Sequence, residues 1–102
     1  MNTFIMMTRL NSGAATSPQA LEQLEQQAVN RISEECPSVK WLSSYAAMGP
    51  YDYIDIFTAD NIEMATRVST LIRTVGHAHS EVWPVIEWTK FKEIVHDLSP
   101  KI

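Results

Sequence analysis

Hydrophobic and polar residues follow two different periods along the chain, and each period predicts one kind of element. Four segments are short and rich in strand-forming residues, or alternate with a period of two. In three others the apolar residues recur every three or four positions, as on the buried side of a helix. The pattern predicts strands over residues 3–10, 38–48, 51–58 and 77–88, and helices between Ser17 and Pro37, Asp60 and Gly76, and Trp88 and Pro100.

The first two predicted helices carry recognisable end signals. Ser17 before Pro18 is typical of an N-cap with proline at the first helical position, and Pro37 ends the stripe that includes Cys36. We expect Cys36 to be a packed thiol, because a buried free cysteine usually acts as a small apolar residue. In the second helix, Asp60 is the expected N-cap and Gly76 the expected left-handed C-terminal residue.

The two central strands are predicted to pair as an antiparallel hairpin. Gly49 and Pro50 form a strong turn signal between them. In the second strand, alternation places one set of side chains toward the helices and the other toward the opposite side of the sheet. We expect Ile54 and Ile56 to face the helices, and the set Tyr53, Asp55 and Phe57 to face away from them.

This order of elements, βαββαβ followed by a short helix, predicts an α+β fold of the ferredoxin-like type. We expect residues 1–102 to form a single domain. Two helices cover only one face of a four-stranded sheet, so the other face must be polar or covered by another chain. Because that face carries aromatic rings, we expect a homodimer that pairs through the open sheet face.

Composition narrows the possible partners and the compartment. The 102 residues have a net charge of −4 and no basic cluster, which argues against nucleic acid and anionic membranes as partners. No segment reaches the roughly 20 apolar residues that span a bilayer. Cys36 is the only cysteine, so no intramolecular disulfide can form, and we expect a cytoplasmic protein. Nucleotide-binding glycine loops and paired-cysteine motifs are absent, and we expect no cofactor.

The hairpin resembles a known family. Gly49, Pro50, Tyr51 and Asp52 match the Gly-x-Tyr-Asp turn of GYD domain proteins, and the resemblance extends over roughly residues 3–92. It implies a ferredoxin-like fold of the dimeric α/β-barrel type, with a ligand cavity in some members. The same segment is similar to the amino-acid-binding domain of leucine-responsive regulators, which makes a stand-alone amino-acid sensor one alternative.

Two histidines form the sharpest candidate site. A spacing of two on a strand would place His77 and His79 on one face, with Glu81 continuing it. Such a set could bind a divalent metal if Asp55 converged on it, or could contact a polar ligand. The simpler interpretation is that both histidines are solvated near a strand start, so no metal is our expectation.

Aspartates near the hairpin have separate expected roles. Asp52 should accept backbone N–H groups of the turn. Asp55, between Tyr53 and Phe57, should have a raised pKa unless Arg9, Lys40 or a partner chain pairs with it.

The candidate ligand-binding residues are therefore Tyr53, Asp55, His77 and His79, and catalytic residues are not assigned. The leading interpretation is a small homodimeric protein that binds a small molecule or serves as an accessory module. Alternatively, Tyr53, Asp55 and His79 could perform acid–base chemistry in a cofactor-free monooxygenase or isomerase.

Overall fold

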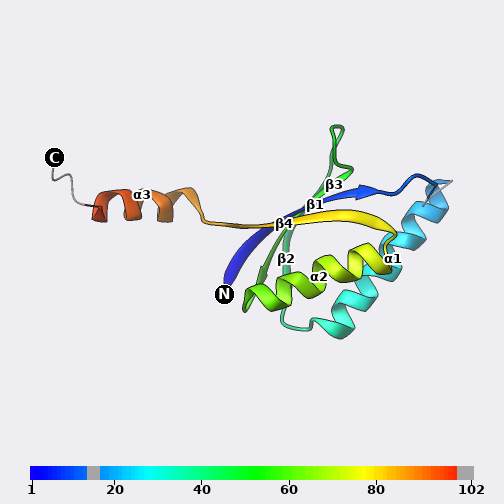
Figure 1. The fold of residues 1–102 in the computed structure, drawn as a ribbon, viewed down its shortest axis with the longest axis horizontal. Coiled ribbons are helices and arrows are strands. Elements are labelled where there is room, and N and C mark those ends of the chain that lie inside the picture. The colour runs from blue at the N-terminus through cyan, green and yellow to red at the C-terminus, as the bar shows by residue number, and fades with distance from the viewer. Residues whose placement is uncertain (14–16, 99–102) are drawn as a thin grey trace.

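The structure, a computed structural model, describes residues 1–13 and 17–98. Pro100, the expected end of the last helix, lies outside the described residues. The elements in chain order (Figure 1) are β1 (Asn2–Leu10), α1 (Pro18–Glu35), β2 (Lys40–Ala46), β3 (Tyr53–Ala59), α2 (Ile62–Thr74), β4 (Ala78–Val85) and α3 (Trp88–Asp97).

The four strands form one antiparallel sheet in the order β2-β3-β1-β4. Helices α1 and α2 pack on the same side of this sheet (Figure 1). The predicted ferredoxin-like α+β fold is confirmed, because two βαβ-type halves interleave so that β1 and β3 lie in the middle. Pro84 lies on the edge strand β4, a position in a sheet where proline is tolerated.

The start of α1 follows the sequence signal, whereas α2 starts one residue later than predicted. Ser17 Oγ accepts a hydrogen bond from the backbone N–H of Ala20 at 3.1 Å. Asn61, not Asp60, caps α2, and its Oδ1 accepts from the N–H of Met64 at 2.9 Å. The prediction of Asp60 was wrong because α2 begins at Ile62, so the residue just before it, Asn61, occupies the cap position.

Gly76 is required for a different reason from the one predicted. Its φ is not positive, and the left-handed residue is the following one, His77, with φ of 49°. A Cβ added at Gly76 would lie 2.6 Å from the carbonyl oxygen of Ile72. Glycine therefore allows the chain to leave α2 close to the last turn of the helix.

The predicted faces of β3 are reversed in the structure. Phe57 is fully buried against the helices, and its ring lies 5.6 Å from that of Phe4 and 5.2 Å from that of Trp41. Asp55 is paired in register with Met6, another core residue, so it also faces α1 and α2. Both sets of β3 side chains contain large apolar groups, and the bulkier ring of Phe57 fills the core while the isoleucines face outward.

A bulge in β2 interrupts the alternation of side chains along that strand. Trp41 pairs with Phe57 but Ser43 pairs with Ile56, so Leu42 is an extra residue between them. Trp41 therefore faces the helices, whereas Ser43 and Tyr45 lie on the other side. Strict alternation would place all three on one face.

The core lies between the sheet and the two helices. Cys36 is 1% exposed and packs there as predicted, and burial raises the pKa of its thiol. The buried core residues are Phe4, Met6, Ile32, Cys36, Phe57, Ala59, Ala65 and Val68.

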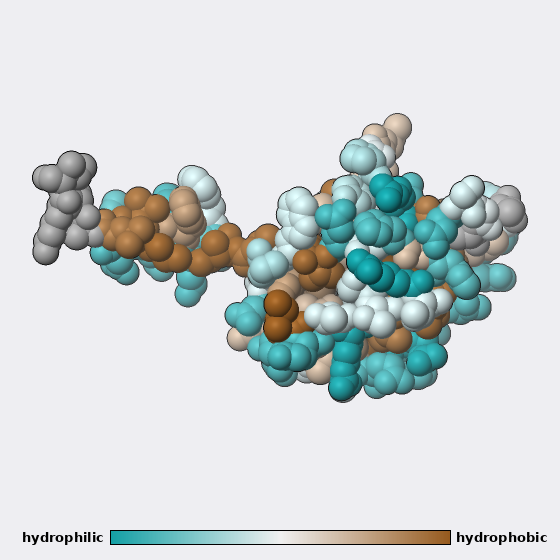
Figure 2. Space-filling view, in the orientation of Figure 1, coloured by the Kyte–Doolittle hydropathy of each residue, from teal (hydrophilic) through white to brown (hydrophobic). Residues whose placement is uncertain are grey.

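Two apolar surfaces remain uncovered in the described residues. The first, called here the open face, is the sheet side without helices, and it carries Ile5, Tyr45, Ile54, Ile56 and Trp83, together with Met7, which is only 8% exposed. The second is α3, which lies away from the sheet and from both other helices (Figure 1). Hydrophobic residues gather along α3 and the segment that leads to it (Figure 2). Its exposed apolar residues are Trp88, Phe91, Ile94, Val95 and Leu98.

Candidate functional site

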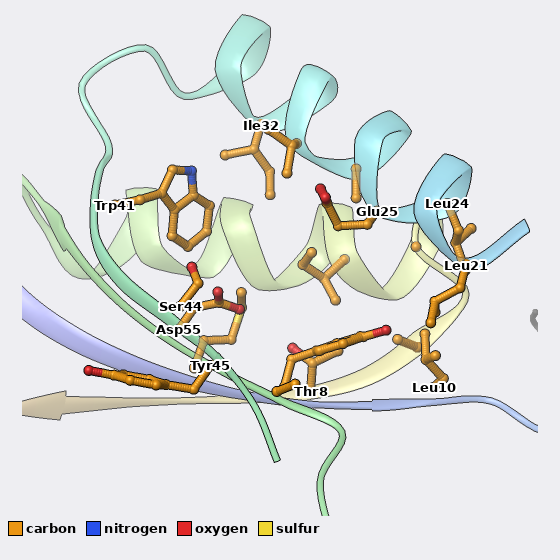
Figure 3. A pocket seen from close by; sticks show the side chains of 18 residues that line it. Thr8, Leu10, Leu21, Leu24, Glu25, Ile32, Trp41, Ser44, Tyr45 and Asp55 are labelled. Carbon is orange, nitrogen blue, oxygen red and sulfur yellow. The ribbon is translucent and has the colours of Figure 1, made fainter. Parts of the chain in front are cut away.

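A pocket of about 420 Å³ lies between α1 and the helix-facing side of the sheet (Figure 3), and we call it the α1 pocket. It exists because the small side chains Ala28, Ala46 and Ala78 leave space beside the packed core. Volumes of roughly 300–1,000 Å³ are typical of small-molecule sites. Its walls are mainly apolar, from Met6, Leu10, Leu21, Leu24, Ile32, Trp41 and Ile72. Its polar side chains are Thr8, Glu25, Ser44, Tyr53 and Asp55.

Thr8 brings an unpartnered hydroxyl to this pocket. The residue is 5% exposed, and its Oγ1 is buried without any hydrogen-bond partner among the described residues. A buried hydroxyl without a partner costs free energy, and such groups are rare in native proteins. A ligand with a hydrogen-bonding group would supply the partner.

Asp55 lies in the pocket beside Trp41 and Ser44 (Figure 3). Burial raises the pKa of its carboxyl above the ordinary value, and the hydrogen bond with Ser44 offsets part of this effect. No ion pair within residues 1–13 and 17–98 involves Asp55. The expected partner Arg9 lies on the open face, in register with His79. Asp55 is therefore available to a ligand.

Tyr53 is the second predicted candidate that faces the α1 pocket. Burial raises the pKa of its hydroxyl, with smaller contributions from the charges of Asp52 and Glu25. The phenol therefore stays protonated at neutral pH and can donate a hydrogen bond.

The raised pKa of Asp55 predicts a specific pH dependence of stability. A carboxyl whose pKa is higher in the folded state favours folding below its unfolded pKa, and this contribution is lost as pH rises through the folded pKa. Asp55→Asn should therefore stabilise the protein at pH 7–8, and the gain should vanish near pH 4. Urea denaturation across this range measures it. A variant that is less stable at pH 8 than at pH 4, relative to wild type, would contradict the burial of a charged carboxylate.

The histidines do not join Asp55. His77 precedes β4 and is exposed, whereas His79 lies on the open face. Met7 pairs with both Ile54 and Glu81, which places Glu81 on the open face too, opposite Asp55. Within the described residues, no group of three His, Cys, Asp or Glu side chains is arranged to hold a metal ion. The acid–base set of Tyr53, Asp55 and His79 is divided between the two faces of the sheet.

Glu81 instead belongs to a polar group on the open face. Tyr51 donates its hydroxyl to the Glu81 carboxylate, which raises the pKa of Tyr51 and lowers that of Glu81. His79 Nε2 lies 3.6 Å from Glu81, and the Arg9 guanidinium lies 6.0 Å from the centre of the Tyr51 ring. Tyr51 therefore has a role on the sheet surface that the turn alone does not explain.

Asp52 links the hairpin to β1. The prediction that its carboxylate accepts N–H groups of the turn was wrong. Its Oδ2 accepts a hydrogen bond from the N–H of Leu10 at 2.8 Å, and its own N–H donates to the carbonyl of Thr8 at 2.7 Å. These bonds extend the pairing of β1 and β3 beyond the last ladder pair, Thr8 with Tyr53. Asp52 thus holds β1, the strand that carries Thr8, against the hairpin.

Two residues of the α1 pocket, Thr8 and Glu25, were not predicted from the sequence. Thr8 is the polar member of an otherwise apolar alternation, after Phe4 and Met6. Glu25 is a charged residue next to the apolar stripe of α1, and in Figure 3 it points toward the cavity. For Thr8, the signal that could have identified it is the presence of a polar side chain in the apolar alternation of β1.

The comparisons with known proteins agree with the fold. The family model described as GYD domain matches residues 4–95, nearly the whole chain. No curated protein matches the sequence significantly. No helix in the described part of the chain is long and apolar enough to cross a membrane.

The solved structures that resemble this one include a leucine response regulatory protein and FFRP-DM1. The leucine response regulatory protein LrpA of Mycobacterium tuberculosis aligns with a TM-score of 0.56 at 10% identity, over 84% of this chain and 51% of that one. The chain thus spans about half the length of that regulator. FFRP-DM1 aligns with a TM-score of 0.54 at 20% identity, over 84% of this chain and all of that one. At these identities the likeness shows the fold alone.

Proposed function

The chain belongs to the GYD domain family, and from this premise we propose that it is a homodimeric protein that binds a small molecule in the α1 pocket. The observation that carries the proposal is the buried, unpartnered Thr8 hydroxyl in an apolar pocket that also contains Asp55 and Tyr53. A few polar groups in an apolar concavity are the usual composition of a ligand site. The proposal includes a reducing, cytosolic location, in keeping with the single, buried Cys36.

The homodimer is proposed from the two uncovered apolar surfaces. Four strands about 4.8 Å apart and roughly 23 Å long present a face of about 450 Å². A stable interface buries about 800 Å² on each partner, so the open face alone is too small. A fully buried aromatic side chain covers about 150–250 Å², and Trp88 and Phe91 of α3, which are 68% and 41% exposed, each add part of that area. We propose that the open faces of two copies pair and that α3 of each copy packs on its partner.

The neutral apolar dye N-phenyl-1-naphthylamine tests the pocket. Its fluorescence should rise on binding, and Leu24→Trp should weaken binding at least about tenfold, because the indole would occupy the cavity. Fluorescence titration measures both effects. Gln23→Trp, on the exposed surface of α1, is the matched control and should bind the dye like wild type. Equal binding by both variants would place the dye on another apolar surface and contradict the proposal.

A cofactor-free enzyme is the second candidate. The raised pKa of Asp55, beside the Tyr53 phenol, suits a general acid or base within the α1 pocket. His79 has no part in this version, since it lies on the open face. Mass spectrometry of a bound compound before and after incubation separates the two functions, because a binding protein returns its ligand unchanged.

An amino-acid sensor receives less support from the α1 pocket. The carboxylate of an amino acid requires a cation or several N–H donors. The described residues that line the pocket include no Lys, Arg or His. A sensor of this kind would need a second site at a boundary between dimers.

A further inference from the structure

The polar groups of the α1 pocket have a marked charge bias. Its two ionisable acids are Asp55, in the interior, and Glu25, on the exposed surface of α1. The described lining contributes no basic side chain to balance them. A carboxylate or phosphate ligand would therefore meet like charges without a counter-ion, which disfavours binding strongly in an apolar site. Anions are the ligand class that this pocket excludes.

The arrangement of acceptors matches a cation that donates several hydrogen bonds. In the β1–β3 register, Thr8 pairs with Tyr53 and Met6 pairs with Asp55. Thr8 and Asp55 are therefore diagonal neighbours on one face, with Cα atoms about 7–8 Å apart. A nitrogen placed between these two residues would have the Asp55 carboxylate and the buried Thr8 Oγ1 as its acceptors. The Thr8 hydroxyl, which is buried without a partner among the described residues, supports a hydrogen-bonding ligand group at this point.

Aromatic rings complete the environment. Trp41 and Tyr53 both line the pocket, and the indole lies above Asp55 and Ser44 in Figure 3. Aromatic faces attract cations as well as apolar groups. Glu25, which points toward the cavity from α1, would attract a cation to the entrance.

We propose that the α1 pocket selects a small apolar molecule that carries one protonated amine, with the amine between Asp55 and Thr8. This inference rests on the proposed function, since it assigns a ligand class to the same pocket. The apolar part of the ligand lies against Leu21, Leu24 and Ile32. An ammonium beside Asp55 also replaces the counter-ion that this carboxylate lacks in the protein itself.

Three probes with the same phenyl group and different charge test the ligand class: 2-phenylethylamine, 2-phenylethanol and 3-phenylpropanoate. Isothermal titration calorimetry on the wild-type protein at neutral pH should show the amine binding at least about tenfold more tightly than the alcohol, with the carboxylate weakest. Because this comparison uses the wild-type protein, it does not depend on any variant folding.

Variants then locate the amine. Asp55→Asn should weaken amine binding about tenfold and change alcohol binding by less than about threefold. Glu22→Gln, an exposed acid on α1 outside the pocket, is the control and should leave both unchanged. If the alcohol or the carboxylate binds as tightly as the amine, the inference of an amine ligand is overturned. Dye binding in the α1 pocket would still support the proposed function. If none of the three probes binds and the dye also fails, the proposed function is overturned as well.

Discussion

Ile56→Glu is expected to convert the homodimer into monomers, with a dissociation constant raised at least about 100-fold. Ile56 lies near the centre of the open face, in register with Ile5 on β1 and Ser43 on β2. A carboxylate there would be buried without a partner when two sheets pair, which costs several kcal/mol. A two-fold interface contains the substitution twice, so the cost is doubled. Sedimentation equilibrium measures the change.

A matched control separates the interface from the fold. Ile62→Glu makes the same substitution at the first residue of α2, where the isoleucine is 62% exposed on the helix side of the sheet. This variant should remain dimeric, and both variants should keep the circular dichroism of wild type. A dimeric Ile56→Glu protein that becomes monomeric only when residues 88–98 are removed would refute pairing through the open face and leave α3 as the sole contact.

Thr8→Val should have opposite effects on stability and on ligand binding. Valine has nearly the shape of threonine, and the hydroxyl it removes is buried without a partner. The free energy of unfolding of the ligand-free protein should rise by about 1–3 kcal/mol, the usual cost of such a group. The affinity for 2-phenylethylamine should fall about tenfold, because the amine loses one acceptor. Urea denaturation and calorimetry provide the two measurements.

The same substitution on the other face of β1 provides the control. Thr3 lies in the open-face alternation of the strand, away from the α1 pocket. Thr3→Val should leave ligand affinity unchanged and alter stability by less than about 0.5 kcal/mol. A destabilised Thr8→Val protein would mean that the hydroxyl already has a partner in the folded protein, and the main support for the pocket would be lost.

Elements with strong local signals could be predicted from the sequence. Helical spacing and the Ser17–Pro18 start defined α1, because a capping hydroxyl and proline act within one turn of the chain. The short-range alternation likewise predicted four strands, and their order with the helices predicted the ferredoxin-like fold. The caps at Asp60 and Gly76 were misplaced by one residue, since neighbouring residues compete for the same position.

The candidate site was predicted only in part. Tyr53 and Asp55 were identified, but with the face of the sheet reversed, and His79 was grouped with them although it lies on the other side. Alternation shows which side chains share a face within one strand, but it does not show which face meets the helices. Thr8 and Glu25 were missed because their importance depends on what surrounds them in space.

The sequence by itself determined the type, order and approximate ends of the elements, because periodicity, proline and capping residues act locally. Only the tertiary structure decided which side of β3 is buried, since Phe57 packs between Phe4 and Trp41 after a bulge at Leu42. Because Phe57 faces the helices, Asp55 faces the α1 pocket, and Ile54 and Ile56 lie on the open face. Which side of β3 is buried is a long-range packing decision, made by residues from three strands at once.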